Sequence, residues 1–251
     1  MGQIVGVVMC RVDGLADVAR NTRILRLRPE TGGPFSFRAG QYAQVGFEGT
    51  EPRYYSMANC PDDDAFEFHV RDTGADCVGT FVLQQLQHGT RAQVSGPHGD
   101  AWLREEHMGP ILAIAGGSGL APVKSIVETA LRRGMTQDIY LYAGARDEAD
   151  VYLDEHFAAL AQQHPKLHYV SVLSDPGPAA DARRRVGMVS DAVAKDFFSL
   201  RNFKAHIAGP LPMVVATIAV LRALNMVDSN IHADAFSAAE IAAKKGRGSP
   251  G

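Results

Sequence analysis

The sequence predicts two domains, an antiparallel β-barrel or sandwich followed by a parallel α/β sheet. Up to about Val94, short runs rich in β-branched and aromatic residues alternate with turn residues, and "FEFHV" alternates its side chains as a half-buried strand does. From Ile111 onward, apolar runs alternate with helical segments, which is typical of βαβ units. The rhythm changes after "EEHMGP", so the predicted boundary lies near residues 104–109.

The elements of the first region are short. The predicted strands are "IVGVVMCRV", "TRILRLRP", "QYAQVGF", "FEFHVRD" and "TRAQVSG". The predicted turns are "DGLAD", "TGGPF", "CPDDD" and "GPHGD", and "GTFVLQQLQ" is the helical candidate. Strands at this close spacing favour antiparallel connections.

In the second region, "ILAIAG" has the unbroken apolar character of a buried parallel strand. The predicted elements that follow it are "PVKSIVETALRRG" (helix), "DIYLYAG" (strand), "YLDEHFAALAQQHP" (helix), "LHYVSVLSD" (strand), "MVSDAVAKDF" (helix), "KAHIAG" (strand) and "PMVVATIAVLRALNM" (helix). A barrel followed by such a sheet suggests two ligands that meet at the domain interface.

Composition excludes several classes of protein. The chain has 251 residues with 46% hydrophobic and 21% charged residues, as ordinary soluble proteins do. A net charge of −3 argues against a nucleic-acid partner, and "DARRRVG" is the only tight basic cluster. The apolar "MVVATIAVLRALNM" is short and carries Arg222, which predicts a core helix and no membrane span.

The cysteines and histidines predict no metal site. Cys10, Cys60 and Cys77 lack CxxC spacing and cannot ligate an iron–sulfur cluster within this chain. The histidines form no HExxH motif, and the sequence has no Gly-x-Ser-x-Gly elbow for a nucleophile. Sparse cysteines and an N-terminus unlike a signal peptide predict a cytoplasmic protein.

A glycine-rich turn lies between a predicted strand and helix. It comprises Gly116, Gly117, Ser118 and Gly119, and Pro122 follows where a first helical turn tolerates proline. Glycines allow close backbone approach, and free N–H groups at a helix start accept an anion. The turn therefore predicts nucleotide binding, although close packing of helix on strand would also use glycine.

A second turn, in "HIAGPLPMVV", repeats this arrangement with Gly209 and Pro210. Loops at the carboxyl ends of parallel strands line the ligand crevice of an open sheet. We expect both turns to face one crevice, and a sharp turn without a ligand is the alternative.

The stretch "RYYS", Arg53 to Ser56, allows two interpretations. The tyrosines could pack a sheet beside a surface arginine and a strand-ending serine. Alternatively, the stretch could bind a flat ligand, with a cation for phosphate, an aromatic face for a ring and a hydroxyl for a ring heteroatom.

Four motifs in order, "RYYS", "GPHGDAWL", "AGGSGLAP" and "AGPLPM", resemble the ferredoxin-reductase-like flavoprotein superfamily. "FSFRAGQY", "SMAN", "HGDAWLR" and the later "ADAF" resemble its NAD(P)H:flavin oxidoreductase branch. The resemblance covers residues 3–237. It implies a six-stranded antiparallel flavin-binding β-barrel in residues 1–106 and an NAD(P)H-binding α/β domain in residues 107–237. Residues 238–251 are predicted to be a disordered tail.

The resemblance assigns roles to residues of the barrel. Ser56 would hydrogen-bond flavin N5 and Tyr55 would lie against the flavin ring, which makes them the predicted catalytic residues. Arg53 would pair with flavin phosphate. The remaining predicted flavin contacts are Tyr54, His69, Val70 and Arg71, the last three through backbone groups, and Gly79 and Thr80 at a helix start facing pyrophosphate.

In the second domain, the resemblance implies that residues 117–122 would hold the pyrophosphate of the nicotinamide nucleotide. The stretch "GARDEADVY" would meet the adenine-side ribose, with Arg146 as the contact. Gly209, Pro210 and Met213 would lie by the nicotinamide, and Asp234 and Phe236 would close over the flavin. Ala208 occupies a position where many relatives have cysteine.

The resemblance implies hydride transfer from NADH or NADPH to flavin N5, with no acid/base dyad. In one version, free flavin (FAD, FMN or riboflavin) is the substrate. In another, bound FAD passes electrons to a ferredoxin or oxygenase through a separate iron–sulfur carrier. Tyr54 and Tyr55 are typical of relatives that hold FAD, whereas Ala208 is typical of flavin reductases. A non-catalytic binding module is the alternative from another class.

Overall fold

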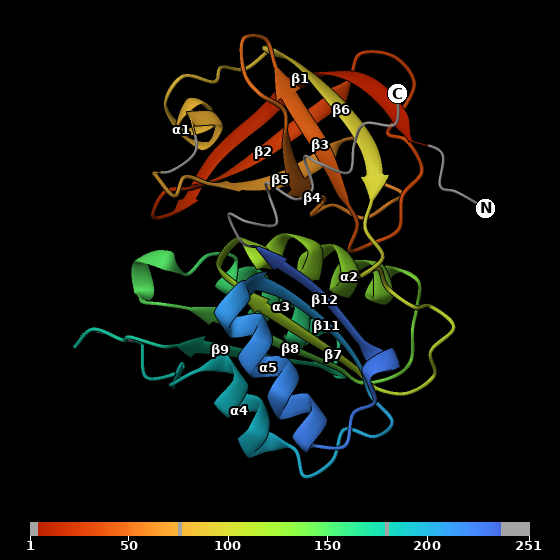
Figure 1. The fold of residues 1–251 in the computed structure, drawn as a ribbon, viewed down its shortest axis with the longest axis vertical. Coiled ribbons are helices and arrows are strands. Elements are labelled where there is room, and N and C mark those ends of the chain that lie inside the picture. The colour runs from red at the N-terminus through yellow and green to blue at the C-terminus, as the bar shows by residue number, and fades with distance from the viewer. Residues whose placement is uncertain (1–4, 75–76, 179–180, 237–251) are drawn as a thin grey trace.

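The computed structural model describes residues 5–74, 77–178 and 181–236. Figure 1 shows two stacked domains, with the N-terminal strands and the first helix in the upper one and the later helices and strands in the lower one. Each domain is built on one six-stranded sheet. The structure thus confirms the predicted two-domain fold.

The upper domain is an antiparallel barrel with strand order β4-β3-β6-β1-β2-β5. Its strands are β1 (Gly6–Ala19), β2 (Thr22–Pro29), β3 (Tyr42–Phe47), β4 (Arg53–Ser56), β5 (Phe66–Arg71) and β6 (Arg91–His98). A bridge between Met57 and Phe68 brings the end of β4 to β5 and nearly closes the barrel. Helix α1 (Cys77–Gln84) lies in the connection from β5 to β6.

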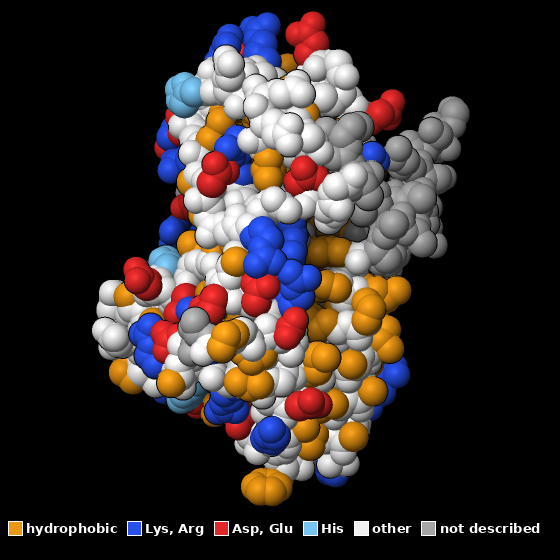
Figure 2. Space-filling view, turned by 90° about the vertical axis from the view of Figure 1, so that its left-hand side faces the viewer, with side chains coloured by type: hydrophobic (Ala, Val, Ile, Leu, Met, Phe, Trp, Pro, Cys, Tyr) orange, Lys and Arg blue, Asp and Glu red, His pale blue; other side chains and the backbone are white. Residues whose placement is uncertain are grey.

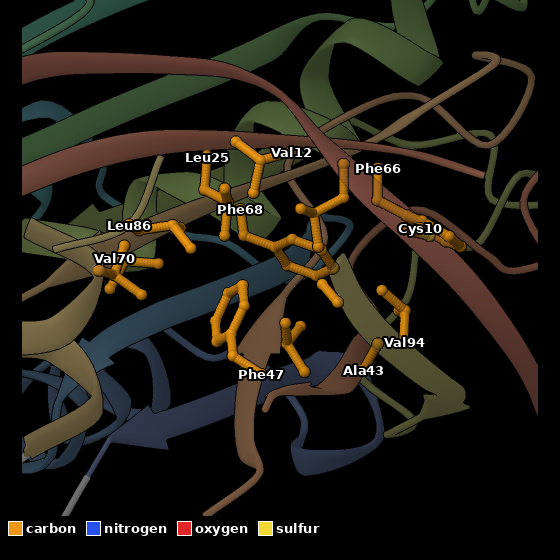
Figure 3. Packing of buried hydrophobic residues seen from close by; sticks show 14 of the residues in the cluster. Cys10, Val12, Leu25, Ala43, Phe47, Phe66, Phe68, Val70, Leu86 and Val94 are labelled. Carbon is orange, nitrogen blue, oxygen red and sulfur yellow. The ribbon is translucent and has the colours of Figure 1, made fainter. Parts of the chain in front are cut away.

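The core of the barrel comes from side chains that alternate along its strands. On β3, for example, Ala43, Val45 and Phe47 are buried while the residues between them are half-buried. Figure 3 shows Ala43 and Phe47 meeting residues from the other strands inside the barrel, and Val45 belongs to the same cluster. Burial of each large apolar side chain stabilises the fold by roughly 1.5–3 kcal/mol.

Strand β1 corrects one prediction, because the expected turn "DGLAD" is part of this strand. The pairing of β1 with β2 shifts register between Val12 and Gly14 and again between Asp17 and Ala19. Such bulges bend a strand, so a long β1 follows the barrel wall where a turn was expected. The reversal comes later, at Asn21, which has a φ of 52°.

The lower domain has a parallel sheet in the order β10-β9-β8-β7-β11-β12. Its strands are β7 (Ile111–Gly116), β8 (Ile139–Ala145), β9 (Leu167–Leu173), β10 (Arg185–Val186), β11 (Lys204–Pro210) and β12 (Ile231–Phe236). Its helices are α2 (Leu120–Arg132), α3 (Asp154–Gln163), α4 (Val189–Asp196) and α5 (Leu211–Ala223). Helices α2 and α3 pack on one face of the sheet and α4 and α5 on the other.

This strand order creates a switch point. From β7 the chain proceeds to β8 on one side, whereas β11 and β12 lie on the other side. Ligands of open α/β sheets bind beyond the strand ends at such a point. The turns after β7 and β11 are the two glycine turns predicted to share a crevice.

Strand β12 was predicted only through the resemblance of "ADAF", without a strand assignment. It pairs with β11 in parallel, so that Asp234 lies beside Ala208 and Phe236 beside Pro210. The predicted division between residues 106 and 107 falls between the last barrel strand and β7, and it stays a prediction. The predicted tail, 238–251, lies outside the described residues. Within the described ranges, none of the helices has the length and apolarity needed to cross a membrane.

Candidate functional site

The two glycine turns pack directly against each other. A Cβ atom on Gly119 would lie 2.1 Å from the carbonyl oxygen of Ala208, and one on Gly209 would lie 3.0 Å from the carbonyl oxygen of Gly116. Gly117 has a φ of +54°, the left-handed conformation that glycine adopts without strain. Glycine is therefore required here to bring β7 and β11 together at the switch point.

A cavity of about 360 Å³ opens beyond these turns, and we call it the nucleotide cavity. Its lining residues are Arg71, Gly116, Gly117, Gly144, Ala145, Arg146, Asp150, Val172, Ser174, Gly187, Met188, Val189, Pro210 and Met213. Helix α2 begins just after the first turn, at Leu120, so its N-terminal N–H groups point to this end of the sheet. Backbone N–H groups at a helix start favour phosphate.

A second cavity of about 170 Å³ lies between the barrel and the parallel sheet, and we call it the barrel cavity. Its lining residues are Tyr42, Tyr54, Tyr55, Ser56, His69, Arg71, Thr73, Ser118, Ala121, Asp234, Ala235 and Phe236. Tyr42 lies opposite Ser56 across the β3–β4 pair, and the rings of Tyr42 and Tyr54 meet edge to face at 5.5 Å. Several aromatic rings beside a hydroxyl suit a flat heteroaromatic ligand.

Arg71 lines both cavities. Its guanidinium is 3.4 Å from the carboxylate of Asp150, and its Nη1 atom would lie 2.9 Å from a Cβ on Gly117. The two cavities therefore adjoin at a cation, which is suited to bind anionic groups of a ligand in either one.

Polar contacts join the domains beside these cavities, on the outer face of β5. Glu67 pairs with Lys124 of α2 at 3.1 Å, and the Nδ1 atom of His69 lies 3.0 Å from the hydroxyl of Tyr152. Lys124 also donates to the carbonyl of Ala58. Figure 2 shows basic and acidic side chains gathered where the domains meet.

Burial and charge determine which side chains at the domain interface are protonated. Burial lowers the pKa of His69, which keeps its imidazole neutral near pH 7. Burial alone would raise the pKa of Glu67, but the hydrogen bond to His69 and the charge of Lys124 outweigh it and lower that pKa to about 2. Burial and the nearby Asp234 raise the pKa of Tyr42 to about 12, so its hydroxyl stays protonated.

The structure brings most of the predicted site residues to the two cavities. Those at the barrel cavity are Tyr54, Tyr55, Ser56, His69, Arg71, Ser118, Asp234 and Phe236. Those at the nucleotide cavity are Arg71, Gly116, Gly117, Arg146, Pro210 and Met213. The remaining predicted residues line neither cavity, namely Arg53, Val70, Gly79, Thr80, Gly119, Pro122 and Gly209. Thr80 instead donates to Asp72.

Sequence reasoning missed several residues at the site. Tyr42 lies within "FSFRAGQY", which carries part of the resemblance, and its alternation with the apolar Ala43 and Val45 was a signal that it faces away from the barrel core. Lys124 lies in a segment predicted only as a helix, and Tyr152, which precedes α3, ends "GARDEADVY", where a contact with the adenine-side ribose was expected and none with β5. Their contacts with β5 depend on how the domains dock, which no local pattern reveals.

Two family models match the chain, one over each domain. Residues 9–102 match the oxidoreductase FAD-binding domain, and residues 113–218 match the oxidoreductase NAD-binding domain. An NAD(P)H-flavin reductase of Vibrio harveyi is 34% identical over 83% of this chain and 89% of its own length. The chain belongs to the ferredoxin-reductase-like family. Most residues of the barrel cavity fall in the FAD-binding match, and all residues of the nucleotide cavity except Arg71 fall in the NAD-binding match.

Other members of this family belong to oxygenase systems. The ferredoxin–NAD(P)+ reductase component of a Pseudomonas putida naphthalene 1,2-dioxygenase system is 42% identical over 85% of this chain and 64% of its own length. The present chain thus spans about two thirds of that relative. The crystal structure of an Amycolatopsis cytochrome P450 reductase matches with a TM-score of 0.85 and 35% identity, over 92% of this chain and 70% of that one.

Proposed function

We propose that this protein transfers a hydride from a nicotinamide nucleotide to a flavin. The observation that carries the proposal is the pair of adjoining cavities, one walled by tyrosines and Ser56 and the other by glycine turns at the switch point. The reductases among its relatives support the same reaction. A bound flavin would supply the hydride-accepting ring.

The residues of the chain would bind and orient the two ligands. Tyr54 and Tyr55 would offer ring faces and edges to the flavin, and the Ser56 hydroxyl would hydrogen-bond the ring atom that receives the hydride. The turn at Gly116 and Gly117 would hold the pyrophosphate of the nucleotide through backbone N–H groups. Alignment of the two reacting rings supplies the rate enhancement, so no general base is needed.

The first test is the visible spectrum of the purified protein after gel filtration without added flavin. Yellow protein that NADH bleaches would show a bound prosthetic flavin, and colourless protein that oxidises NADH once flavin is added would show flavin as substrate. Either result supports the proposed reaction. A protein that neither bleaches nor oxidises NADH with FAD, FMN or riboflavin present would rule it out and favour a non-catalytic binding module.

A second candidate function follows from the oxygenase-system relatives. Bound FAD would pass electrons one at a time to a separate ferredoxin or oxygenase protein. The two described cysteines that are free, Cys10 and Cys60, are buried thiols, as expected of a reducing cytoplasm. Reduction of a purified ferredoxin by NADH in the presence of this protein, without added flavin, would support this candidate.

We further propose that NADH is the preferred donor, because the arginines near the nucleotide cavity are already paired. Arg146 lies 3.5 Å from Asp147, and Arg184 lies 2.9 Å from Glu148 and 2.8 Å from Asp154. A 2′-phosphate carries nearly two negative charges and would have to disrupt such pairs.

We expect kcat/KM for NADH to exceed that for NADPH by about tenfold, a difference of about 1.4 kcal/mol. Asp147→Asn should lower this NADH/NADPH ratio, because it leaves Arg146 with only its 3.9 Å contact to Asp150. The same change also frees Arg20. Asp181→Asn, which releases only exposed Arg183, should leave the ratio unchanged. A wild-type preference for NADPH would contradict the proposal.

A further inference from the structure

The outer face of β5 carries three side chains that all cross the domain interface. Glu67, His69 and Arg71 alternate along the strand, opposite the buried Phe66, Phe68 and Val70. Their partners are Lys124 of α2, Tyr152 and Asp150, respectively. The strand that lines the barrel cavity is thus fastened at every second residue to the domain that forms the nucleotide cavity.

Tyr152 occupies the central place among these contacts. Its side chain is buried, its ring meets the His69 ring edge to face at 5.3 Å, and its hydroxyl lies 3.0 Å from His69 Nδ1. The same hydroxyl lies 3.4 Å from the carbonyl oxygen of Gly117. The hydroxyl oxygen of Tyr152 therefore contacts both strand β5, through His69, and Gly117 in the glycine-rich turn after β7.

The direction of the hydrogen bonds follows from the protonation states. Glu67 is ionised and can only accept, so His69 donates to it from Nε2, over 3.3 Å. Neutral His69 then has an accepting Nδ1 atom. Burial raises the pKa of Tyr152, so its hydroxyl keeps its proton. That single proton forms a three-centre hydrogen bond, with its shorter arm to His69 Nδ1 at 3.0 Å and its longer, weaker arm to the Gly117 carbonyl at 3.4 Å.

We propose that Tyr152 is a positioning residue, whose hydroxyl fixes β5 relative to the Gly117 turn and so sets the alignment of the two reacting rings. The inference rests on the proposed hydride transfer. Tyr152 touches neither reacting ring in this role and acts through His69 and Gly117. Small misalignments of reacting groups slow a reaction strongly while leaving binding of each partner nearly intact.

The first readout needs neither flavin nor activity. In the ¹⁵N NMR spectrum of the flavin-free protein, His69 should show a protonated Nε2 and a hydrogen-bonded, unprotonated Nδ1. Tyr152→Phe should shift the Nδ1 resonance toward that of a free imidazole nitrogen, while Tyr142→Phe should not. Tyr142 is a matched control, since its buried hydroxyl donates to Asp196 within the same domain. A protonated Nδ1 in the wild-type protein would overturn the inference.

The second readout is single-turnover reduction of flavin by NADH. Tyr152→Phe should lower the limiting rate about tenfold and change the NADH dissociation constant less than about twofold. Tyr142→Phe should keep the wild-type rate. A wild-type rate in Tyr152→Phe would overturn the positioning role, whereas an inactive wild-type protein would overturn the proposed function and leave the NMR test to decide the contact.

His69→Leu removes the same contact from the β5 side, since leucine has no acceptor for the Tyr152 hydroxyl, and it serves if Tyr152→Phe does not fold. In the double variant, the loss of rate should be no greater than in the stronger single variant, because both changes remove one shared interaction. Additive losses would show that the two residues act independently and would contradict the inference.

Discussion

The barrel cavity is walled by aromatic and polar side chains, whereas glycines leave part of the backbone exposed in the wall of the nucleotide cavity. Around the first lie the rings of Tyr42, Tyr54 and Tyr55 with the Ser56 hydroxyl. Around the second lie four glycines at or just after the ends of strands β7, β8 and β10, at 116, 117, 144 and 187. Ligand contacts in the barrel cavity thus depend on particular side chains. In the nucleotide cavity they depend on glycines, whose lack of a side chain leaves the backbone accessible.

This difference determines which substitutions disrupt each region. In the barrel, removing a ring or a hydroxyl deletes a contact without disturbing the strands. At the switch point, adding one methyl group forces backbone segments apart, because the turns after β7 and β11 already touch. Substitution by alanine therefore tests a ligand contact in the barrel, whereas at the switch point it tests how closely the backbone segments pack.

The largest effect is expected at Gly119. In Gly119→Ala the new Cβ would meet the Ala208 carbonyl at 2.1 Å, and we expect the free energy of unfolding to fall by about 3 kcal/mol and NADH affinity to fall at least about tenfold. Chemical denaturation and NADH titration measure the two changes.

Gly134→Ala is the matched control. Gly134 also lies in the lower domain and has a φ of +66°, but a Cβ there would meet nothing within 4 Å. We expect a loss of about 1 kcal/mol from the left-handed conformation and an unchanged NADH affinity. Equal effects of the two substitutions would contradict the packing constraint between the turns after β7 and β11.

The contact between Glu67 of β5 and Lys124 of α2, which joins the two domains, gives the second test. Because the pKa of Glu67 is about 2 in the folded protein against an ordinary 4.5, its ion pair stabilises the fold fully above pH 4.5. This stabilisation, on the order of 3 kcal/mol at most, is lost as the pH falls from 4.5 towards 2. Unfolding midpoints of the wild type should therefore drop more steeply over this range than those of Glu67→Gln. If the unfolding midpoints of both proteins fell in parallel with pH, the ionised Glu67 would contribute little to stability.

The third and smallest effect concerns Ser56. Ser56→Ala should slow flavin reduction by about tenfold, equivalent to about 1.4 kcal/mol, with NADH affinity and stability nearly unchanged. Single-turnover kinetics measure it, and Ser95→Ala on the outer face of β6 is the control. An unchanged reduction rate would remove Ser56 from the proposed mechanism and leave Tyr54 and Tyr55 as the side chains that orient the flavin.

The sequence predicts this fold well where local patterns dominate. The unbroken apolar run of β7 and the glycines after it could be recognised directly. A strand buried on both faces is apolar at every position and is recognised without an alternating pattern. The bulged β1 could not, since Asp13 and Gly14 read as a turn and only pairing with β2 holds them in a strand.

The candidate site was predictable to a similar extent. Residues within motifs, such as Ser56 and Gly117, reach the cavities as expected. Arg71 was expected to act through its backbone, whereas its side chain joins the two cavities. The contacts of Tyr152 and Lys124 with β5 were not predictable, because their partners are distant in sequence and meet them only after the domains dock.

Strand β12 has a consequence for synthesis of the protein on the ribosome. The barrel strands are complete by residue 98, yet Asp234, Ala235 and Phe236 form part of the barrel cavity. A nascent chain could therefore fold its barrel early, as N-terminal domains do. The wall formed by β12 would be missing until more than a hundred further residues had left the ribosomal tunnel. Flavin capture in the finished cavity therefore has to wait until β12 has emerged and joined the sheet.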